Sequence, residues 1–246
     1  RRPSFEHGEL RCPWIRYEYS QQLEFAFMIL QYHAYTGEDI AAYIPFIESC
    51  VTFYFAHYTM RNRENTLTPY DANGKLVIYP STALETYKNA TNPTDAVSAL
   101  QDVVSRLAEL PQYVDTRKYR ELYQHIPEIP LREREGKQCI APADCWTQII
   151  NYEIPQLYPV FPYEQFGIGH DRLQLAIDTY WHGIETEGQR HYESWHQDNI
   201  FAARLGLTEE AKRLTVLKFQ DGGQRFPAFW GPGYDWAPDH NWGGSA

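Results

Sequence analysis

The spacing of apolar residues along the chain predicts a mainly helical protein. In residues 93–110, alanine, valine and leucine recur at the i, i+3, i+4 spacing of one helix face. Residues 17–35 carry apolar side chains nearly all round, which predicts a helix buried on most sides. Further helical patterns lie at 39–58, 116–124, 169–185, 189–205 and 208–219. We therefore expect about seven helices and no alternation of strands and helices.

Short extended and irregular segments separate these helices. Asn73-Gly74 lies between two extended runs and predicts a β-hairpin over residues 66–79, followed by a loop over 80–85. Residues 126–143 are rich in proline and predict irregular or extended structure. Residues 221–246 are rich in glycine and aromatic side chains and predict a long loop, which is usually functional.

Several helices buried on more than one side suit two concentric shells of helices. We therefore expect a mainly α fold, an (α/α)6 barrel or toroid with a minor β-hairpin, forming one catalytic domain over residues 1–246. The chain begins Arg-Arg-Pro without a methionine and stops at Gly-Gly-Ser-Ala. From these ends we expect a fragment of a longer protein, in which the barrel is incomplete.

The composition of the chain limits the kinds of molecule that it is expected to bind. The net charge of −10 disfavours nucleic acid and anionic membrane surfaces. Aromatic residues make up 15% of the chain, and tyrosine and tryptophan can cover the apolar patches of a sugar ring while they bond its hydroxyl groups. No apolar run is long enough to span a membrane, and the first residues lack the apolar stretch of a signal peptide.

Cysteines and histidines give no sign of a metal site. The four cysteines form no C-x-x-C pair; Cys139 and Cys145 are paired in one interpretation and free thiols in the other. His191 and His196 would lie about 140° apart on a helix, which is poor for joint ligation. H-E-x-x-H, G-x-S-x-G and G-x-G-x-x-G are all absent. We predict no metal and no cofactor.

Carboxylates offer a more specific chemistry. Glycoside hydrolysis usually needs two, one protonated and one ionised. Glu85 follows Ala83 and Leu84, and apolar surroundings favour the protonated form that a general acid needs. Asp239 lies among polar residues and glycines, which suits an ionised base. The alternative interpretation is a helix-capping Glu and a turn Asp.

Two other acidic residues compete for a role in this site. Glu153 and Asp198 would each either hydrogen-bond sugar hydroxyls or serve ordinary structural hydrogen bonds.

Three segments resemble the catalytic domain of glycoside hydrolase family 95. Residues 80–86 (Pro-Ser-Thr-Ala-Leu-Glu-Thr) resemble that family's loop ending in Ser-Pro-Glu-Asn, and 238–243 (Pro-Asp-His-Asn-Trp-Gly) resemble its Ile-Asp-Gly-Asn-Phe-Gly. Residues 195–206, with Trp195, Asn199 and Ala-Arg-Leu-Gly, resemble a family helix. Departures are Leu84 for Pro, Thr86 for Asn and His240 for Gly. Residues 153–157 replace the family's His-Arg-His-x-Ser, and its Asn-x-Asn pair is not visible.

The resemblance implies an (α/α)6 barrel and an exo-acting, inverting hydrolase of terminal α-L-fucosides or α-L-galactosides. It assigns the general acid to Glu85 and the base machinery to Asp239. It also implies a secreted or periplasmic setting in polysaccharide degradation. With the aromatic composition, it suggests these substrate contacts: Glu153, Trp195, His196, Asn199, Trp230, Trp236, His240, Asn241 and Trp242.

Three alternatives stay open. A phosphorylase on the same barrel needs a cationic pocket near Asp239, and no Lys or Arg lies closer in sequence than Arg225. A polysaccharide lyase acting on an acidic polymer suits the net charge of −10 poorly. A non-catalytic carbohydrate-binding helical domain predicts that Glu85 and Asp239 do not converge on one pocket.

Overall fold

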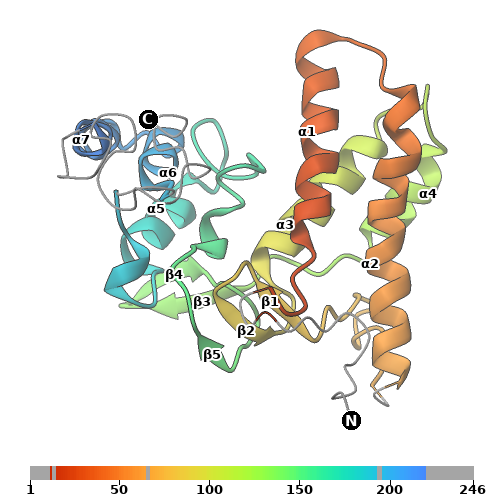
Figure 1. The fold of residues 1–246 in the computed structure, drawn as a ribbon, viewed down its shortest axis with the longest axis horizontal. Helices are drawn as coiled ribbons and strands as arrows, with labels where there is room; N and C mark the ends of the chain where they lie inside the picture. The colour runs from red at the N-terminus through yellow and green to blue at the C-terminus, as the bar shows by residue number, and fades with distance from the viewer. Residues whose placement is uncertain (1–11, 13–14, 65–66, 193–195, 220–246) are drawn as a thin grey trace. The chain divides into compact units, whose positions relative to one another are not determined.

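The computed structural model describes Cys12 and residues 15–64, 67–192 and 196–219. Over these residues the chain is mostly helical, with seven α-helices and short strands (Figure 1). The mainly α class is therefore confirmed, whereas the (α/α)6 barrel stays a prediction. The chain divides into two compact units, one of Arg1–Leu131 with Ala141–Asn151 and one of Arg132–Ile140 with Tyr152–Ala246.

Unit 1 is built on the helix α3, which contacts α1, α2 and α4 as well as the strand β1. Most side chains of α3 are buried, including those of Asp95 and Ser98. Four α-helices, one 3-10 helix and three short strands make up this unit: α1 (Ser20–Thr36), η1 (Ala41–Tyr43), α2 (Ile44–Glu64), β1 (Ser81–Ala83), β2 (Tyr87–Ala90), α3 (Thr94–Leu107), α4 (Thr116–Tyr123) and β5 (Gln148–Ile149).

The prediction that the first helix is buried on most sides is wrong for the described structure. Leu23, Phe27 and Leu30 of α1 are buried, but Phe25 and Tyr35 are 60% and 73% exposed. It is α3 that is covered nearly all round. Apolar residues on every face of a helix indicate that it can be covered, but they do not show which neighbours cover it.

A three-stranded antiparallel sheet in the order β1-β2-β5 lies beside α3. Tyr87 pairs with Ile149, and Lys88 pairs with Gln148. A small apolar core of Ala83, Tyr87, Ala90 and Ala143 lies between these strands and the following loop. This sheet fixes the segment that contains Glu85.

The predicted hairpin is present in a minimal form. Tyr70 and Leu76 form an antiparallel bridge across the Asn73-Gly74 turn, and Asp71 closes the turn by accepting from the backbone of Asn73 and Lys75. A second hairpin, β1–β2, contains residues that were expected as a loop.

Unit 2 combines a hairpin with three α-helices. Its elements are β3 (Leu131–Arg134), β4 (Lys137–Ile140), η2 (Pro155–Leu157), α5 (Leu173–His182), η3 (Glu187–Gln189), α6 (Asp198–Arg204) and α7 (Thr208–Lys218). The β4 strand packs on α5, and α6 packs on α7. The β3–β4 hairpin agrees with the irregular or extended structure expected over 126–143. The helix expected over 189–205 begins only at Asp198.

Candidate functional site

Glu85 lies in a tight turn between β1 and β2. The Thr86 N–H donates to the Ala83 carbonyl at 3.2 Å, which closes a four-residue turn with Leu84 and Glu85 at its centre. Leu84 has a φ of 46°, the left-handed region in which a turn of this kind prefers glycine. Strained backbone of this sort is concentrated at functional sites in proteins.

The φ of Leu84 also distinguishes this turn from the Ser-Pro-Glu-Asn loop that its sequence resembles. Proline is fixed at a φ near about −65°. The conformation of Leu84 is therefore one that the proline of the family's Ser-Pro-Glu-Asn loop does not adopt.

Two side chains hold this turn. The Leu84 N–H donates to Asp95 Oδ2 at 3.4 Å, and the Asn151 side-chain amide donates to Glu85 Oε2 at 3.2 Å. Asn151 lies beside Glu85 because the N–H of the preceding residue, Ile150, donates to the Thr86 carbonyl at 3.0 Å.

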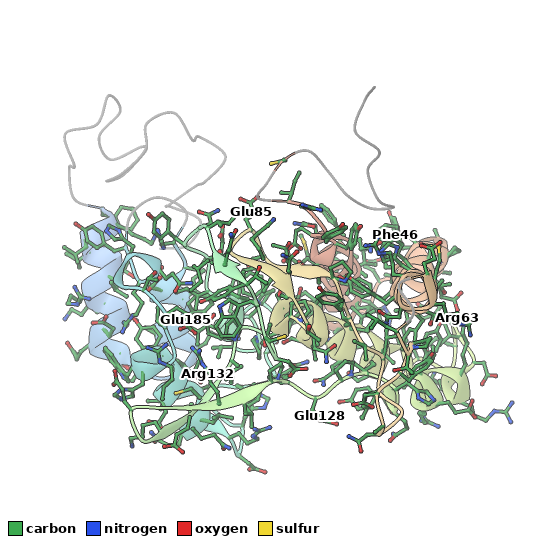
Figure 2. All side chains as sticks on the ribbon, turned by 90° about the horizontal axis from the view of Figure 1, so that it is seen from below. Phe46, Arg63, Glu85, Glu128, Arg132 and Glu185 are labelled. Atoms are coloured by element: carbon green, nitrogen blue, oxygen red, sulfur yellow. The ribbon has the colours of Figure 1, made fainter. Side chains whose placement is uncertain are left out.

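Glu85 is the one side chain in residues 81–88, all of them described, that is not buried. Figure 2 shows it at the hairpin on one edge of the drawn side chains. A half-buried carboxyl group at a fixed position can exchange a proton with a bound molecule.

Two further carboxyl groups, those of Glu18 and Glu24, interact electrostatically with Asp95, which supports this turn. Burial raises the pKa of Asp95 to about 6, and burial together with the charge of Asp95 raises that of Glu24 to about 7. Burial, and then the charge of Asp95, hold the pKa of Glu18 well above its usual range. Glu18 Oε1 accepts from the Ser20 hydroxyl at 2.5 Å and from its N–H at 2.9 Å. Part of this cluster is therefore protonated near neutral pH.

Sequence reasoning missed the role of Asp95. Its place in the first turn of α3 has a sufficient local explanation, because acidic residues stabilise the positive end of a helix. Its support of the turn is shown only by its hydrogen bond from the Leu84 N–H, which it makes while fully buried.

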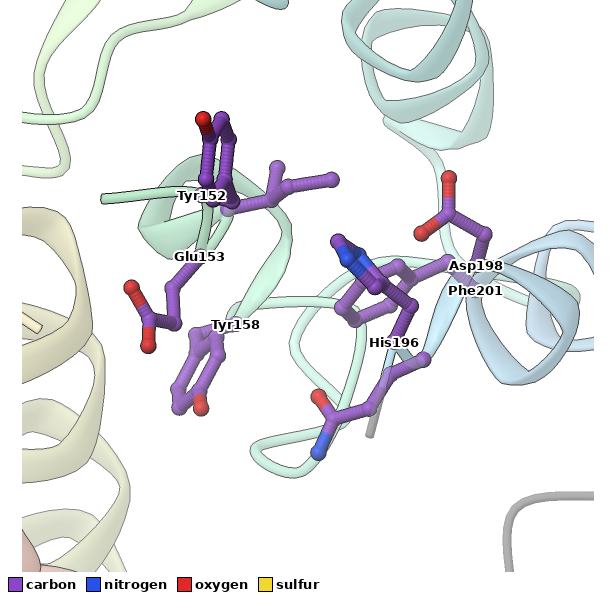
Figure 3. A pocket seen from close by; sticks show the side chains of 8 residues that line it. Tyr152, Glu153, Tyr158, His196, Asp198 and Phe201 are labelled. Carbon is purple, nitrogen blue, oxygen red and sulfur yellow. The ribbon is translucent and has the colours of Figure 1, made fainter. Parts of the chain in front are cut away.

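In unit 2, a small cavity brings together two of the predicted substrate-binding residues. Glu153 and His196 line it together with Asp198, as Figure 3 shows, and the remaining lining residues are Tyr152, Ile154, Tyr158, Gln197 and Phe201. The cavity volume is about 40 Å³. That volume admits a few water molecules, whereas pockets for drug-sized ligands measure roughly 300–1,000 Å³.

The polar groups at this cavity have strongly shifted pKa values. Burial lowers the pKa of His196 to about 3, which leaves the imidazole neutral, and His191 and Lys218 add to the effect. Burial raises the pKa of Asp198 to about 7, against the opposing charge of Arg190, whose Nε lies 3.6 Å from Asp198 Oδ1. The Arg190 guanidinium also lies over the Tyr180 ring, 4.0 Å from its centroid. Asp198 is thus part of a structural charge network as well as of the cavity.

His191 and His196 are closer than the predicted helix allowed. Residues 190–197 contain no helix where they are described, and the two rings lie 5.4 Å apart. Within the described residues, no group of three or more His, Cys, Asp and Glu side chains is arranged to hold a metal ion.

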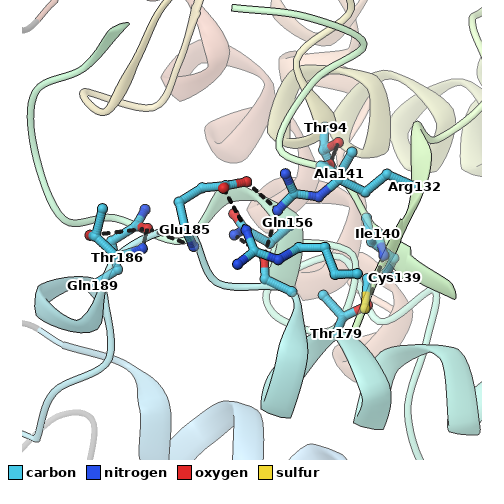
Figure 4. A network of polar contacts seen from close by, with 12 residues as sticks. Thr94, Arg132, Cys139, Ile140, Ala141, Gln156, Thr179, Glu185, Thr186 and Gln189 are labelled. Carbon is cyan, nitrogen blue, oxygen red and sulfur yellow. Dashed lines mark hydrogen bonds and ion pairs between the residues drawn. The ribbon is translucent and has the colours of Figure 1, made fainter. Parts of the chain in front are cut away.

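A second charged network ties the β3–β4 hairpin to the segment after α5. Glu185 accepts from Arg132 and, at 2.6 Å, from Arg134, while Arg132 also donates to the Gly183 carbonyl at 2.9 Å. Figure 4 shows the contact between Glu185 and Arg132. Because Glu185 occupies both guanidinium groups, the network has a structural role.

The remaining predicted site residues divide into two groups. Asn199 is described and lies buried on α6. Seven others lie outside the described residues: Trp195, Trp230, Trp236, Asp239, His240, Asn241 and Trp242. The convergence of Glu85 and Asp239 therefore stays a prediction.

All four cysteines are free thiols, including Cys139 and Cys145. No helix in the described ranges is long and apolar enough to cross a membrane. Comparison of the chain with protein-family models and with curated proteins found no match.

Proposed function

We propose that the protein is an exo-acting glycoside hydrolase in which Glu85 is the general acid. The observation that carries this proposal is the position and partial burial of the Glu85 side chain. A carboxyl group that is neither exposed nor buried is placed by a strained turn and held by the amide of Asn151. Such fixed placement is what a proton donor to a glycosidic oxygen needs.

In this proposal the reaction is a single displacement that inverts the anomeric carbon. Glu85 gives its proton to the glycosidic oxygen as the bond between that oxygen and the anomeric carbon breaks. A water molecule attacks the anomeric carbon from the opposite face and releases its proton to Asp239. The chemistry needs no cofactor.

The sugar and the setting come from the family 95 resemblance. We propose a terminal α-L-fucoside or α-L-galactoside of an oligosaccharide or polysaccharide, in a secreted or periplasmic degradation system. The left-handed backbone of Leu84 departs from the family's loop, so the substrate has to be found with a panel of glycosides.

A second candidate is a non-catalytic carbohydrate-binding domain. The cavity of unit 2 favours it, because about 40 Å³ holds water or single hydroxyl groups and no sugar ring, so this cavity is not the deep pocket that an exo-acting enzyme needs for a terminal sugar. In this candidate Glu85 binds a sugar hydroxyl without transferring a proton.

Hydrolysis of aryl α-L-fucosides, α-L-galactosides and related glycosides tests the proposal. We expect turnover by the wild-type protein and a loss of roughly 10²- to 10⁴-fold in kcat/KM for E85Q on alkyl glycosides. E128Q is the matched control, because Glu128 is exposed and pairs only with Lys75 in the described structure. The anomer of the first-formed sugar, followed by NMR, tests inversion.

Other outcomes identify the rivals. Turnover that requires phosphate indicates a phosphorylase, and an unsaturated product from an acidic polymer indicates a lyase. Sugar binding without turnover, unchanged in E85Q, supports the non-catalytic candidate and overturns the proposed function.

A further inference from the structure

We propose that Asn151 is a positioning residue that selects which oxygen of Glu85 carries the transferred proton. This inference rests on the proposed function of Glu85. It concerns a residue that does not itself touch the reacting atoms, and it follows from the hydrogen bonds around the turn.

Asn151 is held in place by the sheet of unit 1. It follows β5, which pairs with β2 through Tyr87 and Ile149. The next contact, from the Ile150 N–H to the Thr86 carbonyl at 3.0 Å, brings the chain beside the residue that follows Glu85. The backbone of Asn151 is therefore held at a fixed position beside the turn that its side chain contacts.

The contact has a direction that matters for proton transfer. The Asn151 side-chain nitrogen can only donate, and it donates to Oε2 of Glu85 at 3.2 Å. An oxygen that accepts this hydrogen bond is the poorer place for the acidic proton, because in a neutral carboxyl group the carbonyl oxygen is a better acceptor than the hydroxyl oxygen. The proton of the neutral acid consequently resides on Oε1, and the side-chain torsions of Glu85 are fixed at the same time.

The charge of Lys88 does not make this selection. Glu85 is among the charges that raise the pKa of Lys88, although burial dominates and lowers it overall. A point charge acts on the whole carboxylate, whereas a hydrogen bond acts on one oxygen. Asp95 supports the Leu84 backbone and so acts one step further away.

The test compares N151A with N89A. Asn89 is a matched control, because its side-chain amide also joins β2 to the same following segment, donating to Thr147 Oγ1 at 3.1 Å without contacting Glu85. Its φ of 50° means that N89A disturbs the hairpin backbone as well. The N89A variant therefore measures how a general destabilisation of the hairpin affects catalysis.

Each variant of the protein is assayed on two glycosides of the same sugar, one with an alkyl and one with a dinitrophenyl leaving group. Only the alkyl group needs protonation as it departs. For N151A we expect kcat on the alkyl glycoside to fall about 10- to 100-fold, with KM and the dinitrophenyl rate nearly unchanged. For N89A we expect any loss to be equal on both substrates.

An equal loss on both substrates in N151A, or no loss on either, overturns the positioning role. A wild-type protein that hydrolyses no glycoside, or an E85Q variant with full activity, overturns the proposed function instead. The positioning claim is then decided by crystal structures. We expect Glu85 in one conformer in the wild type and in several in N151A, and a single unchanged conformer in N151A contradicts it.

Discussion

At the scale of single residues, Asp95 is the buried group with the largest consequences for the site. It accepts from the turn that carries Glu85, and its charge raises the pKa values of Glu18 and Glu24. Its own pKa rises from 3.8 to about 6 through burial. The folded protein thus holds a proton that the unfolded chain releases between these pH values, so stability falls as the pH rises through this window.

The variant D95N removes this dependence. A shift of this size corresponds to about 3 kcal/mol of unfolding free energy. We expect the wild type to lose about that amount relative to D95N as the pH rises from about 3.5 to about 6.5, and to lose more above it, because the charge of Asp95 also raises the pKa values of Glu24 and Glu18. Urea unfolding of both proteins across this range measures the difference. A constant difference between the two proteins would show that Asp95 is not protonated in the folded state.

Two glutamates give a contrast between enclosed and exposed ion pairs. The Glu185 side chain is 11% exposed and holds Arg132 and Arg134, whereas the Glu128 side chain is 83% exposed and pairs with Lys75. We expect E185A to cost about 3–5 kcal/mol, because it leaves two enclosed guanidinium groups without their carboxylate. E128A should cost less than about 1 kcal/mol. Similar costs in thermal or urea unfolding would contradict the structural role of Glu185.

At the scale of elements, α1 is covered on one face and open on the other. Leu23 is fully buried, whereas Met28 is 58% exposed. We expect L23A to destabilise the protein by about 2–5 kcal/mol and M28A by less than about 0.5 kcal/mol. Denaturant midpoints of the two variants measure this. Equal costs would mean that a neighbour covers the open face of α1.

Helices were predicted well from sequence where the apolar spacing and the capping residues all lie within one continuous segment. The expected helix at 208–219 matches α7, and that at 93–110 contains α3. Strand pairing was predicted poorly, because β2 pairs with β5 from more than fifty residues further along the chain, which no local pattern reports. The helix expected over 189–205 was too long, because apolar spacing continued through a segment whose polar groups turn inward instead, as His196 does.

The candidate site was predicted in part. Glu85 was proposed from its apolar neighbours and the motif resemblance, and its role stays a prediction, whereas Glu153 and His196 do share a cavity. Asn151 and Asp95 were not identified, because each acts through a hydrogen bond to a residue that is not its sequence neighbour, 66 positions away for Asn151 and 11 for Asp95. In a single sequence, neither an isolated Asn nor an Asp at the start of a helix indicates which distant residue it will contact.

At the scale of the whole molecule, each unit has one feature that bears on function. Unit 1 carries the strained turn with Glu85, and unit 2 carries the small cavity with neutral His196 and protonatable Asp198. The proposed acid and its positioning residue both belong to unit 1. The proposed reaction therefore depends on where a bound sugar lies with respect to Glu85 and Asp239.

A crystal structure of the E85Q variant with an unhydrolysed fucoside or galactoside tests this most directly. We predict that the side chain at position 85 lies within hydrogen-bond distance, about 2.6–3.2 Å, of the glycosidic oxygen. We also predict that its carboxamide carbon lies about 6.5–9.5 Å from the carboxyl carbon of Asp239, across the sugar ring. A sugar bound away from position 85, or a separation well beyond about 10 Å, would contradict the account.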